Sequence, residues 1–109
     1  MRVSFESGLV AILRTKTESD ARYMANALVN AGIKLIEFTT TTPGALNLVE
    51  EFSANKDLYV GLGTCITKEH VASGKAAGAQ FLISPHTDEE VIRETKKLDL
   101  ISIPGVASP

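Results

Sequence analysis

Short apolar runs alternate along this chain with stretches whose apolar residues recur every three or four positions. The first run, 9–13, is continuously aliphatic, which is typical of a strand covered on both faces. Thr17, with Asp20 three residues later, then resembles an N-terminal capping box, and Gly32 marks a helix stop. Between them, apolar residues form a stripe along one helix face: Ala21, Met24, Ala25, Leu28 and Val29. The first unit is therefore predicted to be a strand followed by a helix.

This strand–helix unit recurs along the sequence. Further strands are predicted at 33–38, 58–62, 79–83 and 100–103, and further helices at 43–52, from 67 to about 78, and from about 88 to 98. Pro43 suits the first turn of its helix. Helical connections between buried strands imply parallel pairing with right-handed crossovers. Two α/β architectures fit this pattern, an open doubly wound sheet and part of a (βα)8 barrel.

The residues that follow each predicted strand favour the barrel. No G-x-G-x-x-G motif follows the first strand, so a dinucleotide site is unsupported. Polar or turn-forming residues follow all five strands, at Arg14, 37–42, 63–64, 84–86 and 104–105. The carboxyl ends of the strands form the face at which barrel enzymes carry their catalytic groups.

Composition narrows the possible functions. The 109 residues contain 11 Lys and Arg against 13 Asp and Glu, so no broad basic surface for nucleic acid or anionic lipid is expected. No apolar run approaches the ~20 residues that span a bilayer, so we expect a cytoplasmic protein without a membrane partner. The single cysteine, Cys65, can neither form an internal disulfide nor hold a structural zinc by itself. We predict no metal and no cofactor.

Glu37 is the main chemical candidate because it is a carboxylate within an apolar strand. Strand side chains alternate, so Glu37 shares a face with Leu35 and Thr39, while Ile36 and Phe38 point the other way. If that second pair meets the helices, Glu37 points into the barrel. Burial of an unpaired carboxylate raises its pKa, which suits general acid–base chemistry. The alternative is a strand-end glutamate that is solvated or paired with a lysine.

Other polar residues near the strand ends each have a chemical and an ordinary interpretation. Arg14 can clamp a carboxylate or phosphate, or be a surface arginine. Thr64 can offer a hydroxyl and a backbone N–H to an anion, or be a turn residue. Cys65 is expected to be a small packing residue, since no base is adjacent. His86 precedes acids that a first helical turn favours anyway, so it predicts no metal site. The threonines at 39–42 can contact a ligand or simply favour a strand.

Taken together, five stretches of the sequence resemble the 2-keto-3-deoxy-6-phosphogluconate (KDPG) and 4-hydroxy-2-oxoglutarate aldolase family: 10–14, 31–39, 61–64, 78–85 and 103–106. The resemblance covers nearly the whole chain, in family-like order and spacing. It implies a (βα)8 barrel, usually trimeric, that acts as a class I aldolase. In this reaction a lysine forms a Schiff base with a 2-keto acid, which is cleaved to pyruvate and an aldehyde.

The resemblance also implies roles for individual residues. Glu37, in the context I-E-F-T, matches a strand-two glutamate that moves protons through water. Thr64 matches the threonine of a G-x-G-T turn that binds the substrate carboxylate, and Arg14 matches an arginine that helps to hold it in some members. Pro85 matches a strand-four S-P loop that lines the pocket. Thr41 stands where some members have an arginine, and Arg14 is available to substitute for it.

The family's Schiff-base lysine lies on strand six, and this chain ends after its fifth predicted strand, so no such lysine is expected here. Ser108 and Pro109 are typical of a helix start. A (βα)8 domain typically needs ~250 residues and at least about 200. We therefore expect residues 1–109 to be the N-terminal portion of one barrel domain, with five parallel strands and four helices, truncated before strand six and inactive alone.

Two other functions stay open from the sequence. The chain can be a free-standing half-barrel that assembles with itself or with a partner and binds a small anion without catalysis. It can also be part of another phosphate-binding (βα)8 enzyme, similar to thiamine-phosphate synthases. All three interpretations share a small-molecule ligand and exclude a nucleic-acid partner.

Overall fold

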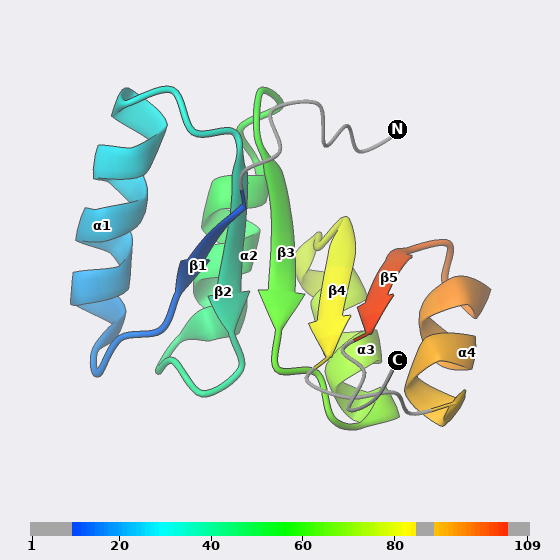
Figure 1. The fold of residues 1–109 in the computed structure, drawn as a ribbon. Helices are drawn as coiled ribbons and strands as arrows, with labels where there is room; N and C mark the ends of the chain where they lie inside the picture. Colours follow the sequence, from blue (N-terminus) through cyan, green and yellow to red (C-terminus); the bar gives the residue numbers. More distant parts are fainter. Residues whose placement is uncertain (1–9, 85–88, 105–109) are drawn as a thin grey trace, which may run out of the picture.

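The computed structural model describes residues 10–84 and 89–104, which form a parallel sheet flanked by helices (Figure 1). The strands are β1 (Ala11–Leu13), β2 (Leu35–Thr39), β3 (Tyr59–Gly63), β4 (Phe81–Ser84) and β5 (Ile101–Pro104). The helices are α1 (Glu18–Asn30), α2 (Ala45–Ser53), α3 (Lys68–Ala77) and α4 (Glu89–Lys97). The predicted order of five strands and four helices is confirmed. The strand borders differ from the predicted ones by no more than two residues.

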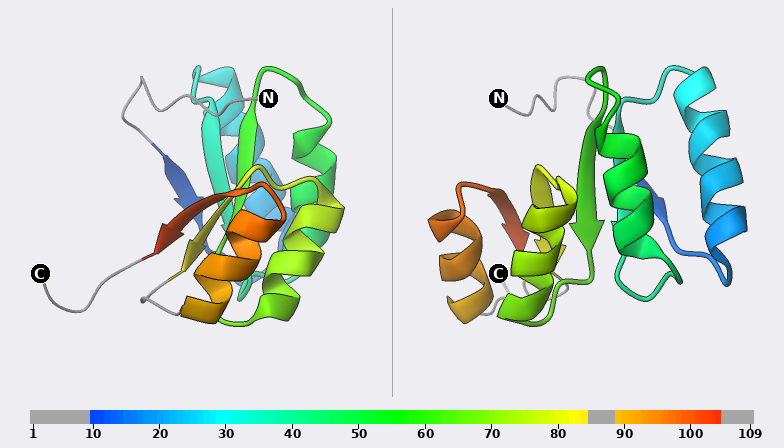
Figure 2. Two further views of the ribbon diagram at one scale, coloured as in Figure 1. Left: turned by 90° about the vertical axis from the view of Figure 1, so that its right-hand side faces the viewer. Right: turned by 180° about the vertical axis from the view of Figure 1, so that it is seen from behind.

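The strands lie in the sheet in their sequence order, and every neighbouring pair is parallel. A doubly wound sheet reverses its strand order at one point and carries helices on both faces. Neither feature occurs in the described part of the chain, where α1 to α4 all cover one face of the sheet (Figure 2). The architecture is therefore part of a (βα)8 barrel, and the open doubly wound sheet is excluded. We call the helix-covered face the outer face and the opposite one the inner face.

The main core lies between the outer face and the helices. Ile36 and Phe38 are fully buried there, and the Phe38 ring lies 5.5 Å, between centroids, from the ring of Phe52 on α2. The condition stated for β2, that these two residues meet the helices, therefore holds, and Glu37 faces the opposite side of the sheet. Other residues of this core are Leu13, Val60, Leu62 and Leu82 from the strands and Ala25, Leu48, Val49, Val71 and Val91 from the helices.

Two helices begin at threonines, as their sequences predict. The Thr17 hydroxyl accepts a hydrogen bond of 3.1 Å from the backbone N–H of Asp20 and caps α1. Thr67 caps α3 by accepting from the N–H of His70, and Nδ1 of His70 accepts from the N–H of Thr67 in return. This reciprocal pair satisfies donors that a helix start otherwise leaves free. It also gives His70 a structural role.

The start of α2 differs from the prediction. Gly44, with φ +72°, is the residue that precedes the helix, so Pro43 lies before the first turn and not within it. Glycine adopts this left-handed conformation without the steric penalty of a side chain. The Glu18 side chain also packs over Gly44, where a Cβ atom would overlap it. The turn therefore needs glycine for both its backbone conformation and its neighbour.

The inner face carries a smaller apolar cluster. Leu35 and Phe81 are buried in it, and Val10, Tyr59, Ile83 and Ile101 pack partly buried around them. Ile12 of β1, which pairs in register with Glu37, is 62% exposed.

No helix within 10–84 or 89–104 is both long enough and apolar enough to cross a membrane.

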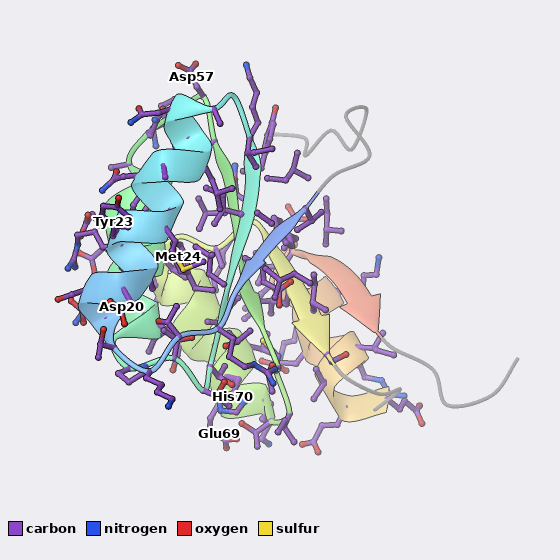
Figure 3. All side chains as sticks on the ribbon, turned by 60° about the vertical axis from the view of Figure 1, so that its left-hand side comes forward. Asp20, Tyr23, Met24, Asp57, Glu69 and His70 are labelled. Atoms are coloured by element: carbon purple, nitrogen blue, oxygen red, sulfur yellow. The ribbon has the colours of Figure 1, made fainter. Side chains whose placement is uncertain are left out.

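We predict that Phe38→Ala lowers the free energy of unfolding by about 3–5 kcal/mol, because it leaves a cavity between β2 and α2. Urea denaturation measures this loss. Tyr23→Ala is the matched control: Tyr23 is 78% exposed on α1, away from the sheet (Figure 3), and its truncation is expected to change stability by about 0.5 kcal/mol or less. Equal losses in the two variants would contradict the placement of the core.

Candidate active site

Glu37 lies at the middle of β2, on the inner face, and only 2% of it is exposed. Its strand neighbours in register are Ile12 of β1 and Gly61 of β3. Oε2 of the carboxyl is buried and has no hydrogen-bond partner among the described residues. A native protein rarely leaves a buried oxygen in this condition, and such an atom is a candidate for contact with a ligand or a reacting group.

The surroundings of Glu37 favour its uncharged form. Burial removes the carboxyl from water and raises its pKa from 4.5 to about 7, while the Arg14 guanidinium opposes this rise. Near neutral pH the group is therefore present in both protonation states. A carboxyl with this property can both take and give a proton, as general acid–base catalysis requires.

Two glycines of β3 make room on the inner face. A Cβ atom at Gly63 would overlap the Glu37 carboxyl, and a Cβ atom at Gly61 would overlap the Phe81 ring. Gly61 and Gly63 are separated by one residue, so both face the same side of the strand. The Glu37 carboxyl therefore lies directly over β3 because Gly63 has no side chain. Sequence reasoning missed this contact, because the register pairs Glu37 with Gly61 and the carboxyl reaches Gly63 diagonally.

Arg14 and Thr64 meet at the carboxyl end of the sheet. Nη2 of Arg14, just after β1, donates a hydrogen bond of 3.1 Å to Oγ1 of Thr64, just after β3. The two residues are 50 positions apart in the sequence, and β2 with Glu37 lies between their strands. The structure thus brings together three of the four predicted site residues. A guanidinium beside a hydroxyl is a suitable arrangement for holding a carboxylate.

Thr64 has a left-handed backbone with φ +57°, which is uncommon for a residue with a branched side chain. The neighbouring loop supports it: the Thr40 hydroxyl donates 2.8 Å to the Thr64 carbonyl, and the Thr40 N–H donates 2.9 Å to the Gly63 carbonyl. Such conformations persist where the surroundings enforce them, and they are frequent at functional sites.

Cys65, next to Thr64, belongs to the core. Its side chain is buried, the thiol donates to the carbonyl of Leu62 at 3.3 Å, and burial together with the nearby Glu37 raises its pKa to about 12. A thiol with so high a pKa is a poor nucleophile at neutral pH. The structure therefore fits the expected packing role.

Lysines are absent from the described site. All seven lysines of the sequence fall within the described residues and are exposed: Lys16, Lys34, Lys56, Lys68, Lys75, Lys96 and Lys97. Lys68 lies 3.5 Å from Glu90 in an ion pair between α3 and α4. Their exposure agrees with the expectation that these lysines are solvated.

A hollow of the described residues lies on the helix side of the sheet. Pro85, the fourth predicted site residue, lies outside the described residues, as does His86. A groove of about 530 Å³ opens between the starts of α2 and α3, with Leu62, His70 and Ser73 in its lining. It lies on the helix side of the sheet, and Arg14, Glu37 and Thr64 do not line it. We place the candidate site on the inner face, where the perturbed carboxyl is.

Comparisons with known proteins agree with this architecture. The family described as "Aldolase: KDPG and KHG aldolase" matches residues 3–109. A 2-dehydro-3-deoxy-phosphogluconate aldolase of Pseudoalteromonas atlantica is 32% identical over 101 residues, which are 92% of this chain and 47% of that protein. The chain thus spans about half the length of this curated relative.

Solved structures of the same kind share the fold. A KDPG aldolase from Legionella pneumophila, with pyruvate captured at low pH as a covalent carbinolamine intermediate, is 36% identical with a TM-score of 0.81. The match covers 91% of this chain and 48% of that one. The enzyme of Zymomonas mobilis with 3-phosphoglycerate is 27% identical with a TM-score of 0.82, over 92% of this chain and 48% of that one.

The five strands and four helices therefore correspond to half of an aldolase (βα)8 barrel. The chain belongs to the KDPG and KHG aldolase family. This assignment favours the aldolase over the thiamine-phosphate-synthase-like alternative.

We predict that the stability of the chain falls as the pH rises through the range set by Glu37. The unfolded carboxyl ionises near 4.5 and the folded one near 7, so the folded state binds more protons between these values. The pKa difference corresponds to a loss of up to about 3 kcal/mol between pH 4 and pH 8. In Glu37→Gln this component should vanish. Urea denaturation across this range would contradict the account if both proteins had parallel profiles.

We predict that Gly63→Ala displaces the Glu37 carboxyl toward water and lowers its pKa. The variant should lose about 1–3 kcal/mol through overpacking and should also lose most of the stability decline between pH 4 and pH 8. Gly61→Ala is the comparison variant, because a Cβ atom there overpacks the same strand against the Phe81 ring, whereas a Cβ atom at Gly63 meets the Glu37 carboxyl. A full pH-dependent decline in Gly63→Ala would show that Gly63 does not set the position of the carboxyl.

Proposed function

We propose that this chain supplies the proton-transfer and carboxylate-binding half of a class I aldolase. The whole enzyme would cleave 2-keto-3-deoxy-6-phosphogluconate or a related 4-hydroxy-2-keto acid to pyruvate and an aldehyde. The observation that supports this most is the buried Glu37 carboxyl, with its unpartnered oxygen and raised pKa, in a chain of this aldolase family. We propose that residues 1–109 are the N-terminal portion of one barrel domain.

In this proposal a lysine from outside the 109 residues forms the Schiff base at C2 of the substrate. Removal of the proton from the C4 hydroxyl lets the C3–C4 bond break, the aldehyde leaves, and the electron pair passes to C3 as an enamine. Protonation of C3 and hydrolysis then release pyruvate and the free lysine. Glu37 is the proposed residue that takes and returns these protons, through water, because its pKa of about 7 suits both directions.

Arg14 and Thr64 are the proposed binding residues for the substrate carboxylate. Their hydrogen bond of 3.1 Å places a positive charge and a hydroxyl side by side at the carboxyl end of the sheet. Pro85 is proposed, from the family resemblance alone, to line the same pocket. The whole enzyme is proposed to be a cytoplasmic homotrimer that needs no metal or cofactor.

A complementation experiment tests the function. The chain is joined to the remaining half of the Legionella pneumophila enzyme, and pyruvate release from KDPG is measured. We expect activity, and we expect Glu37→Gln to lower kcat by about 10²- to 10⁴-fold. Glu50→Gln, at an exposed position of α2, is the matched control and should retain activity. A fully active Glu37→Gln enzyme would contradict the proposed role.

The 109-residue chain alone is predicted to form no covalent adduct with pyruvate on borohydride reduction. Its seven lysines are all exposed, and a lysine needs a desolvated or cationic setting to become a nucleophile at neutral pH. Mass spectrometry of the reduced mixture measures the adduct, with the whole Legionella pneumophila enzyme as the positive control. A specific adduct on any lysine of the chain would overturn this prediction.

A non-catalytic, self-assembling half-barrel is the second candidate. The observation that favours it is the exposed Ile12 on the inner face of β1, which is an edge strand with one described neighbour. Open parallel edges tend to recruit further strands. Sedimentation velocity distinguishes the two: a single defined oligomer supports assembly, and heterogeneous association supports a missing half-barrel.

A further inference from the structure

The threonine loop, residues 39–42, uses its hydroxyls within the protein. Oγ1 of Thr39 lies 3.0 Å from Oγ1 of Thr41 and 3.1 Å from Oγ1 of Thr42. The Thr40 hydroxyl binds the Thr64 carbonyl. Thr39 and Thr42 are almost completely buried, at 1% and 2% exposure. The hydroxyls thus form an internal network. Thr41 is nevertheless exposed, and Thr40, Thr41 and Thr42 line the groove between α2 and α3, so both interpretations from the sequence stay open.

The network has one direction. Oγ1 of Thr42 lies 3.4 Å from the carbonyl oxygen of Leu13, which can only accept, so the Thr42 proton is donated there. The bond between Thr39 and Thr42 must then be donated by Thr39, and the bond between Thr41 and Thr39 by Thr41. Each hydroxyl has one proton, and this order uses every one of them.

At its end the network contacts the residues before and after Arg14. Thr42 donates to the carbonyl of Leu13, the residue before Arg14, and accepts 3.3 Å from the N–H of Thr15, the residue after it. The backbone on both sides of Arg14 is therefore hydrogen-bonded to one buried hydroxyl, that of Thr42 in the threonine loop. Arg14 itself is exposed and reaches Thr64 with its guanidinium.

We propose that Thr42 is a positioning residue: its buried hydroxyl, oriented by Thr39, fixes the end of β1 so that Arg14 reaches the anion site at Thr64. This inference rests on the proposed function, in which Arg14 and Thr64 bind the substrate carboxylate. Thr42 touches no reacting atom in this arrangement. Its contribution lies in holding the arginine in the geometry that binds, and small displacements of such groups weaken binding.

The test compares pyruvate binding by the isotope-labelled 109-residue chain and its variants, followed by NMR. Thr42→Val keeps the shape and removes the hydroxyl, and it is expected to weaken pyruvate binding about tenfold. Thr42→Ser restores the hydroxyl and is expected to bind within about twofold of the wild type. Thr42→Ala, which cannot overpack, serves if the valine variant does not fold.

Thr95→Val is the matched control. Thr95 is also a fully buried threonine whose hydroxyl donates to a backbone carbonyl, that of Val91 at 2.6 Å, but it lies on α4. This variant should lose stability without a change in pyruvate affinity. The order of the Arg14 Nε–H group, from ¹⁵N relaxation, is the second readout, and it should fall in Thr42→Val and not in Thr95→Val.

Each outcome decides the proposal. Weaker binding and a more mobile Arg14 in Thr42→Val alone support it. Unchanged binding in Thr42→Val, or equal weakening in Thr95→Val, overturns it. Absence of pyruvate binding by the wild type contradicts the proposed carboxylate site instead. The Arg14 relaxation then still decides the positioning role, which a rigid Arg14 in Thr42→Val would overturn.

Discussion

The Glu37 carboxyl occupies the space that Gly63 leaves open on β3, and the candidate site depends on this contact. The carboxyl is almost completely buried on the inner face, on the strand between those that Arg14 and Thr64 follow. Desolvation raises the pKa of Glu37 to about 7, and the ionised group costs stability at neutral pH. The outer core, with Ile36 and Phe38 on the same strand, supplies the burial that offsets this cost.

The polar groups of the site come from three consecutive strands: Glu37 from the middle of β2, and Arg14 and Thr64 from just after β1 and β3. The threonine loop that follows Glu37 contacts the segments of both Arg14 and Thr64. Thr42 contacts the backbone around Arg14, and Thr40 contacts the carbonyl of Thr64. Parallel strands in sequence order place their carboxyl ends at one edge, so residues 50 positions apart can meet there. The described residues thus hold a candidate proton-transfer group and a candidate anion site, and the proposed nucleophile is to be supplied by the other half of the barrel.

The sequence predicts the elements and the face of Glu37 well, because local patterns determine them. Alternation within β2 separates Glu37 from Ile36 and Phe38, and threonine caps define where α1 and α3 begin. Other features depend on contacts between distant segments. The position of the Glu37 carboxyl over Gly63 depends on how β2 and β3 pair and on which way the side chain extends. The direction of the hydroxyl network depends on the distance from Thr42 to Leu13. The sequence pattern predicts Pro43 in the first turn of its helix, but α2 begins at Ala45, after the left-handed Gly44 over which the Glu18 side chain packs.

The central claim is that burial on the inner face keeps Glu37 partly protonated near neutral pH. The most direct measurement is the titration of the ¹³Cδ signal of Glu37 in the 109-residue chain, assigned by its absence from Glu37→Gln. The account predicts a midpoint near pH 7, well above the ordinary value of 4.5. A midpoint near 4.5 would show that the carboxyl is hydrated, and the proposed proton-transfer role would lose its physical basis.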